Sequence, residues 1–204
     1  FGAPVPFQDH ATRACNAAIR MKKIEEHLNQ HFLEENLSPS PLMTRFGINT
    51  GEMVVGNMGT INRMDYTIMG HAVNLAARLE SVNKQYGTWI LTSELTYDAT
   101  GDSLAARRLD RVRVVGISEP VRLYEIIDEA TVVPDETVQM LDEFHQGLEL
   151  FEHREWGESG SVFSRLNREF PDDGPSKTYF DRTRKFQKEE PPGDWDGVFN
   201  LTRK

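Results

Sequence analysis

The sequence carries at residues 67–81 the stretch TIMGHAVNLAARLES. Apolar residues recur there at three- and four-residue steps, which predicts an amphipathic helix that begins after Gly70. Asn74 and Arg78 are four residues apart on another face of this helix, so they point the same way. They form either a solvated surface pair worth about 0.2–0.5 kcal/mol, or an amide and a guanidinium presented together to a phosphate-bearing ligand.

The segments around this helix alternate between extended and helical patterns. A long helical signal runs from Gln8 to Leu37, with Asp9 as a candidate cap. The other expected elements are extended segments at 44–51 and 52–59, a turn-rich segment at 60–67, a strand at 88–93, a short helix from Glu94 to about Ala99, and hairpin strands at 107–116 and 120–127. This order predicts an α/β or α+β sandwich with helices on one face of a sheet.

The pattern changes near Pro134, which divides the chain into expected domains at 1–133 and 134–204. Three helices are expected in the second part, at 136–156, 157–170 and 175–186. The spacing of its aromatic residues, glycine and proline is similar to one tetratricopeptide-type helical pair. One such repeat cannot bury its own apolar face, so we expect it to pack on the first domain, as a helical cap or as part of a peptide-binding array.

Composition limits the classes of function. The 204 residues have a net charge of −9, which disfavours nonspecific binding to nucleic acid or to an anionic membrane. No apolar run is long enough to cross a bilayer, and Cys15 has no disulfide partner in the sequence. We expect a cytoplasmic location, with any membrane anchor lying upstream of this segment.

Four separate segments carry a family resemblance. They read FGAPVPFQDHATRACNAAIRM (1–21), FGINTGEMVVGNMG (46–59), MDYTIMGHAVNLAARLES (64–81) and SEPVRLYEI (118–126). In this order and spacing they resemble the class III nucleotidyl cyclase catalytic domain, the fold of adenylyl and guanylyl cyclases, over about residues 1–128. The resemblance implies a ferredoxin-like α+β core, here truncated at its N-terminus, and the tail resembles the helical extensions of bacterial cyclases.

The resemblance also implies roles for three residues. Asn74 would orient the ribose, and Arg78 would neutralise charge on the reacting phosphate. Thr67 would recognise the purine and favour ATP over GTP, since its hydroxyl can donate to or accept from adenine; otherwise it is a local cap before the helix. The implied reaction converts ATP to 3',5'-cyclic AMP and pyrophosphate, assisted by two Mg or Mn ions.

The sequence departs from the family pattern at several positions. The family's two metal-binding aspartates and its base-recognising lysine precede the FGAP-like segment, so we expect the metal ligands upstream of Phe1 and none in this chain. Asp102 follows a short helix and is not assigned as a ligand. Val115 and Ile117 stand in a hairpin where lysine is usual. The remaining candidates are Arg111 or Arg113 as replacement cations, each otherwise on a solvated strand face, and His71 as a structural residue at the start of the helix.

Family members work as dimers with a shared active site, so the expected partners are ATP and a second copy of this chain, with exchanged strands as one arrangement. Two hypotheses follow. The chain is part of an adenylate cyclase and alone is inactive, or it is a catalytically inactive dimerisation or regulatory module. Guanylate cyclase activity is a further alternative.

Overall fold

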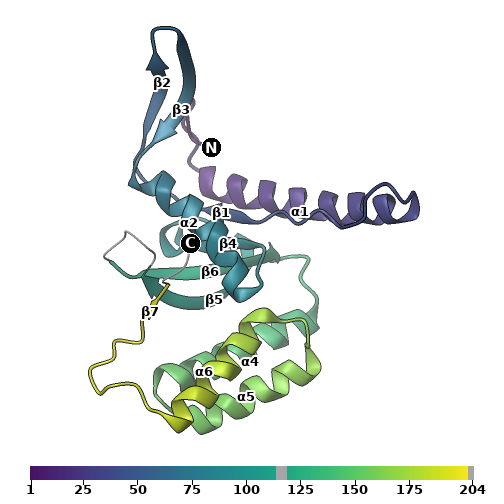
Figure 1. Cartoon of the computed structure of the whole chain (residues 1–204), viewed down its shortest axis with the longest axis vertical. Helices are drawn as coiled ribbons and strands as arrows, with labels where there is room; N and C mark the ends of the chain where they lie inside the picture. Colours follow the sequence, from purple (N-terminus) through teal and green to yellow (C-terminus); the bar gives the residue numbers. More distant parts are fainter. Residues whose placement is uncertain (114–118, 202–204) are drawn as a thin grey trace.

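The computed structural model describes residues 1–113 and 119–201 (Figure 1). Its helices are α1 (His10–Glu34), α2 (His71–Tyr86), α3 (Glu94–Asp98), α4 (Asp135–Glu152), α5 (Trp156–Glu169) and α6 (Gly174–Lys188). Its strands are β1 (Phe46–Ile48), β2 (Val54–Thr60), β3 (Arg63–Met69), β4 (Ile90–Ser93), β5 (Leu104–Arg113), β6 (Val121–Glu129) and β7 (Phe199–Asn200). The predicted α+β class and the hairpin of β5 and β6 are confirmed.

Five strands form the main sheet in the order β1-β4-β6-β5-β7. Helices cover both of its faces, so the expectation of helices on one face is wrong. Ile90 belongs to an apolar cluster with Cys15 and Ile19 of α1, whereas the next residue, Leu91, packs with α2 and α4–α6. Successive side chains of a strand point to opposite faces. Every residue of β4 is buried, and such a strand needs cover on both sides.

The strands β2 and β3 form a separate two-stranded hairpin that extends away from the main sheet (Figure 1). The segment at 60–67 was expected to be turn-rich, but its last five residues belong to β3 and its first residue ends β2, so only Ile61 and Asn62 form the turn. Each residue of β3 is exposed, so the strand lacks the alternation between buried and exposed positions that would have marked it.

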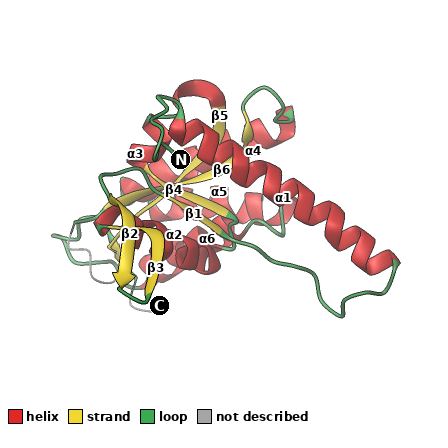
Figure 2. Cartoon of the chain, turned by 90° about the horizontal axis from the view of Figure 1, so that it is seen from above, coloured by secondary structure: helices red, strands yellow, loops and turns green. Residues whose placement is uncertain are grey.

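The long helix α1 lies across the sheet and continues well beyond its edge (Figure 2). Asp9 precedes it but makes no side-chain cap. Its carboxylate instead accepts from Nε of Arg13 at 2.8 and 2.9 Å, so the expected capping role is wrong. An ion pair one helical turn away satisfies the oxygens that would otherwise accept from backbone amides.

The three helices expected after Pro134 are confirmed, and they pack on the sheet. Phe144, Phe163 and Tyr179 share one buried cluster with Leu109 and Leu123 of the sheet. Nothing divides this core at residue 133, so the division into two domains stays a prediction.

Of the described helices, none combines the length and apolar character needed to span a membrane.

Candidate functional site

The site is built on α2, which begins directly after β3. Gly70 makes this turn with φ of +154°, a backbone conformation that favours glycine. A Cβ at this position would lie 3.3 Å from the carbonyl oxygen of Glu52 and 3.4 Å from Cα of Met53, so the space is also limited. The first turn of α2 is thereby fixed beside the segment that joins β1 to β2.

Contacts with β1 and the segment after it fix the rest of α2. A Cβ on Gly47 would overlap the carbonyl oxygen of Ala76 and the amide nitrogen of Glu80, so helix and strand lie in backbone contact. Nδ2 of Asn83, which is fully buried, donates to the carbonyl oxygen of Phe46 at 2.9 Å. Asn49 donates to the carbonyl oxygen of Ala72 at 3.0 Å. The sheet therefore sets the axis and the rotation of α2.

Asn74 and Arg78 lie on the same face of α2, one turn apart, as predicted. The Asn74 side chain is exposed and that of Arg78 is partly exposed. Neither side chain makes a hydrogen bond or an ion pair with any residue in the described part of the chain, nor do the two bond to each other. The pair is thus positioned by a rigid helix while its polar groups stay available to a ligand.

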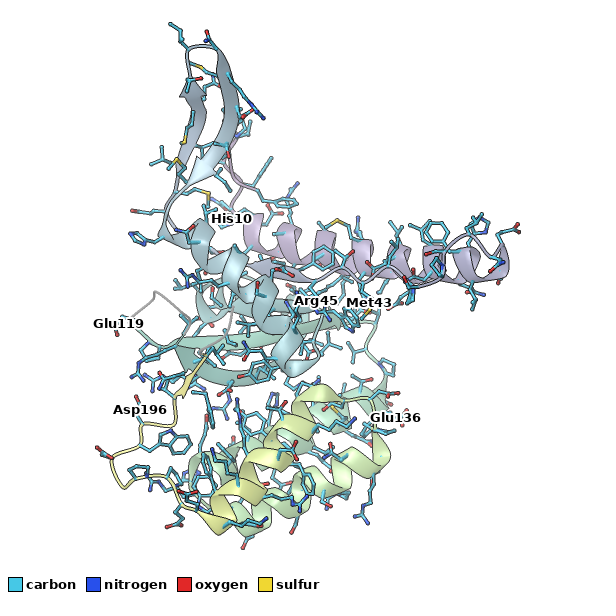
Figure 3. The ribbon with its side chains drawn as sticks, in the orientation of Figure 1. His10, Met43, Arg45, Glu119, Glu136 and Asp196 are labelled. Carbon is cyan, nitrogen blue, oxygen red and sulfur yellow. The ribbon has the colours of Figure 1, made fainter. Side chains whose placement is uncertain are left out.

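Thr67 lies in β3, opposite Gly56 of β2, and is exposed. It does not cap α2, because the N-cap is Gly70 and no side chain makes a cap bond there. Its neighbours Tyr66 and Ile68 line a groove of about 740 Å³ between the hairpin and α1. His10 lines the same groove (Figure 3). By strand alternation Thr67 points to the other face of the hairpin.

Of the remaining predicted residues, His71 lies on the same helix three residues before Asn74, whereas the others lie in β5 or in the turn before it. Nη2 of Arg113 lies 2.7 Å from Oδ2 of Asp196, which Figure 3 labels on the segment before β7, so this partly exposed arginine is engaged in an ion pair at the surface. Arg111 is exposed on β5, and Asp102 is exposed in a 3-10 turn. His71 is the exposed first residue of α2.

The positions of Val115 and Ile117 lie outside the described residues. Within residues 1–113 and 119–201, no group of three or more His, Cys, Asp or Glu side chains could hold a metal ion. The described side chains therefore do not fit the two-metal site that the family resemblance implies.

A family model described as the "Adenylate and Guanylate cyclase catalytic domain" matches residues 1–128. The chain belongs to this family. All three predicted site residues, Thr67, Asn74 and Arg78, lie within the matched part of this cyclase domain.

Curated relatives of the cyclase domain include two adenylate cyclases. The terminal-differentiation-specific enzyme of Dictyostelium discoideum is 35% identical over 178 residues, 84% of this chain and 8% of the relative. Adenylate cyclase 1 of Rhizobium meliloti is 38% identical over 128 residues, 62% of this chain and 19% of the relative. The chain thus spans a fifth or less of either relative. The Dictyostelium match is longer than the family model, so it must include part of the helical extension.

Solved structures similar to the cyclase domain include one of each substrate class. The adenylyl cyclase CyaB of P. aeruginosa aligns with a TM-score of 0.58 at 36% identity, covering 66% of this chain and 68% of that one. The guanylyl cyclase Cya2 aligns with a TM-score of 0.57 at 36% identity, covering 63% and 64%. The predicted cyclase fold is confirmed.

Sequence reasoning missed the residues that hold α2 in place. Asn83 lies on the apolar stripe of the helix with Leu79, Val82 and Tyr86, and a polar residue on such a stripe signals a buried hydrogen bond. Asn49 gave no comparable signal, because it lies in an irregular segment after β1. Its Oδ1 accepts from Oγ of Ser93 at 2.5 Å, a contact that depends on the tertiary fold.

Proposed function

We propose that this chain is part of an adenylate cyclase that converts ATP to 3',5'-cyclic AMP and pyrophosphate, so that the cell signals through the cyclic nucleotide. One observation carries the proposal. In a chain of the cyclase family, α2 presents Asn74 and Arg78 on one face, and neither side chain has a polar partner among the described residues.

In this reaction the ribose 3'-oxygen bonds to the α-phosphorus, the bond from that phosphorus to the pyrophosphate oxygen breaks, and the 3'-hydroxyl loses its proton. Negative charge gathers on the phosphate oxygens in the transition state. The guanidinium of Arg78 supplies a permanent positive charge and paired donors directed at these oxygens. The amide of Asn74 holds the ribose, which keeps the attacking oxygen in line with the phosphorus.

Thr67 is the proposed contact to the purine. Its hydroxyl can donate to or accept from the edge of adenine, and the curated relatives above are adenylate cyclases, both of which support ATP as the substrate. One hydroxyl discriminates weakly between purines. Guanylate cyclase activity is the second candidate, supported by the similarity to the guanylyl cyclase Cya2.

The proposal assigns the ligands of the two Mg or Mn ions to residues outside this sequence, since the described side chains offer no carboxylate cluster. It also places the complete site between two copies of the chain. The exposed apolar side chains of the hairpin support such a contact, with Val54 and Met64 each 66% exposed and Tyr66 61% exposed. Under this proposal the chain alone is inactive.

The test uses the full-length protein, meaning the parent protein that includes the residues outside this sequence. Its production of cyclic AMP and cyclic GMP with Mg or Mn is measured beside that of Arg78→Ala and of a control variant, Lys84→Ala. Lys84 is exposed in the last turn of the same helix. Loss of one preorganised charged donor costs about 100- to 1,000-fold in rate. We expect cyclic AMP production to fall by about this factor in Arg78→Ala and to be unchanged in Lys84→Ala.

Cyclic GMP as the main product would instead favour the guanylate cyclase alternative. A full-length protein that dimerises but makes neither product would contradict the proposal and favour the catalytically inactive module. If Arg78→Ala kept wild-type activity, the proposed role of Arg78 would be wrong.

A further inference from the structure

The C-terminal end of α2 is tied to the helical extension by a buried polar cluster of Tyr86, Asp110 and Arg182. The hydroxyl of Tyr86 donates to Oδ2 of Asp110 on β5. Arg182 of α6 donates through Nη1 to the same oxygen at 2.6 Å and through Nη2 to the Tyr86 hydroxyl at 3.2 Å. Tyr86 is 1% exposed and Asp110 is 5% exposed. The cluster thus joins α2, the sheet and the extension away from solvent.

The surroundings of the cluster leave its three members little freedom to move. The guanidinium carbon of Arg182 lies 3.5 Å from the centre of the Phe199 ring and 5.1 Å from that of Tyr179. Tyr179 in turn donates to the carbonyl oxygen of Leu109 at 2.8 Å. A Cβ on Gly174, the first residue of α6, would overlap the carbonyl oxygen of Tyr86, so α6 also abuts the backbone at the end of α2.

Charge and burial keep the hydroxyl of Tyr86 protonated. Burial, reinforced by the negative charge of Asp110, raises the pKa of Tyr86, so the phenol keeps its proton and remains a donor. Arg182 is the cation that balances the buried carboxylate of Asp110. Removal of this cation would leave a buried charge without its partner, which is strongly unfavourable.

We propose that Arg182 and Tyr86 are positioning residues for the cyclase reaction, which hold α2 so that Asn74 and Arg78 meet the nucleotide in the reactive geometry. The inference rests on the proposed function. Tyr86 follows Arg78 by eight residues on one continuous helix, or about 12 Å along its axis. A helix transmits rotation and tilt along its length, so movement at Tyr86 reaches Arg78. The contacts with β1 hold α2 against the edge of the sheet, and this cluster adds a tie from its C-terminal end to β5 and α6.

The proposal gives the extension a direct part in the activity. A shift of about 1 Å in a catalytic group can cost about 100-fold in rate. A variant that loosens the end of α2 should therefore lower kcat more than it changes KM, because the affected interaction is made in the transition state. A purely structural cluster would lower thermal stability but leave kcat unchanged in the molecules that are folded.

The experiment uses the full-length protein with Tyr86→Phe, Arg182→Gln, Arg182→Lys and the control Arg184→Gln. Tyr86→Phe removes one hydroxyl and keeps the ring, so it is the variant that retains the fold best. Arg184 is exposed two residues further along α6, and its variant is the same chemical change. Cyclase kinetics are measured well below each melting midpoint, and hydrogen exchange of the amides of α2 is followed in parallel.

We expect kcat to fall about 10- to 100-fold in Tyr86→Phe and Arg182→Gln with KM nearly unchanged. Arg182→Lys, which keeps the charge but not the two-armed geometry, should fall between these variants and the wild type. Exchange along α2 should rise in the same order, and Arg184→Gln should match the wild type.

If the wild type is active but Tyr86→Phe and Arg182→Gln change neither kcat nor the hydrogen exchange of α2, the positioning role is wrong while the proposed function stands. A wild type that makes no cyclic nucleotide would overturn the proposed function instead. In that case hydrogen exchange still tests whether the contact of Arg182 with Tyr86 holds α2 in place. If the α2 amides of Arg182→Gln exchanged as in the wild type, the positioning role of Arg182 would be wrong as well.

Discussion

His145 of α4 joins the helical extension to β5 through a neutral imidazole. Its Nε2 accepts from the backbone amide of Arg108 at 3.0 Å. Burial, followed by the positive charges of Arg108 and Arg107, lowers the pKa of His145 below its ordinary value of 6.5. The unfolded chain therefore binds a proton at a higher pH than the native protein does. Its contribution to stability is complete above about pH 6.5 and is lost progressively as pH falls toward the lowered native pKa.

We expect the free energy of unfolding to decrease as the pH falls below about 6.5, and His145→Gln to flatten this decrease. The glutamine oxygen can still accept from Arg108 but does not titrate. Urea unfolding at a series of pH values measures the effect. His27→Gln, on the exposed part of α1, is the control and should leave the slope unchanged. A slope in His145→Gln identical to that of the wild type would contradict the prediction.

Single side chains were predictable from the sequence where one element contains the whole pattern. The common face of Asn74 and Arg78 follows from helical periodicity within four residues. The partners of Tyr86 are 24 and 96 residues away, and no local period links such positions. Arg113 shows the same limit, because its ion pair with Asp196 depends on the return of the chain to β7.

The packing of α2 against β1 depends on the missing side chain of Gly47. Gly47→Ala would drive a methyl group into the backbone of α2 at Ala76 and Glu80, and neither backbone atom can move without the helix. Overpacking of this kind typically costs about 1–3 kcal/mol. We expect a loss of stability of at least this size, measured by urea unfolding. We also expect reduced cyclase activity in the full-length protein, because α2 carries Asn74 and Arg78.

Gly56→Ala is the matched control for this substitution. Gly56 also lies in a strand, β2, but a Cβ there would meet no atom within 4 Å. The control should unfold at the same urea concentration as the wild type. Equal stability of the two variants would show that α2 does not depend on close contact with β1.

The helices and the buried strands were predictable because apolar residues recur at regular steps in α2 and α4 and follow one another in β4. The strand β3 was missed because tertiary burial does not shape it: each of its residues is exposed. The cover on both sheet faces was missed too, since a pattern of helices and strands does not say where the later helices pack. One face is covered by α1, and the other is covered by α2 together with the helices of the extension.

The sheet shares one buried apolar cluster with the helical extension, since Leu109, Val112 and Leu123 of the sheet pack with side chains of α4–α6. Arg107 of β5, 3% exposed, is also bound by two oxygens of Asp173 at 2.7 and 2.8 Å. Exposure of Leu109, Val112 and Leu123 alone would cost about 4.5–9 kcal/mol, which is of the order of the net stability of a typical domain.

We therefore expect residues 1–133 alone to lack a cooperative thermal transition in circular dichroism, whereas residues 1–201, which keep every described element, should unfold like the 204-residue chain. A cooperative transition of the 1–133 chain near the melting temperature of the 204-residue chain would mean that the extension is a separate unit.

The shared core also bears on protein engineering. A chimaera that joins this catalytic module to a different sensor or output domain is usually cut at the change in sequence character, here Pro134. Such a cut would divide the Arg107 and Asp173 pair and remove Arg182 from Asp110. A segment moved into such a chimaera should therefore extend at least through β7. A fusion point after Leu201 keeps both buried polar contacts within the transferred segment.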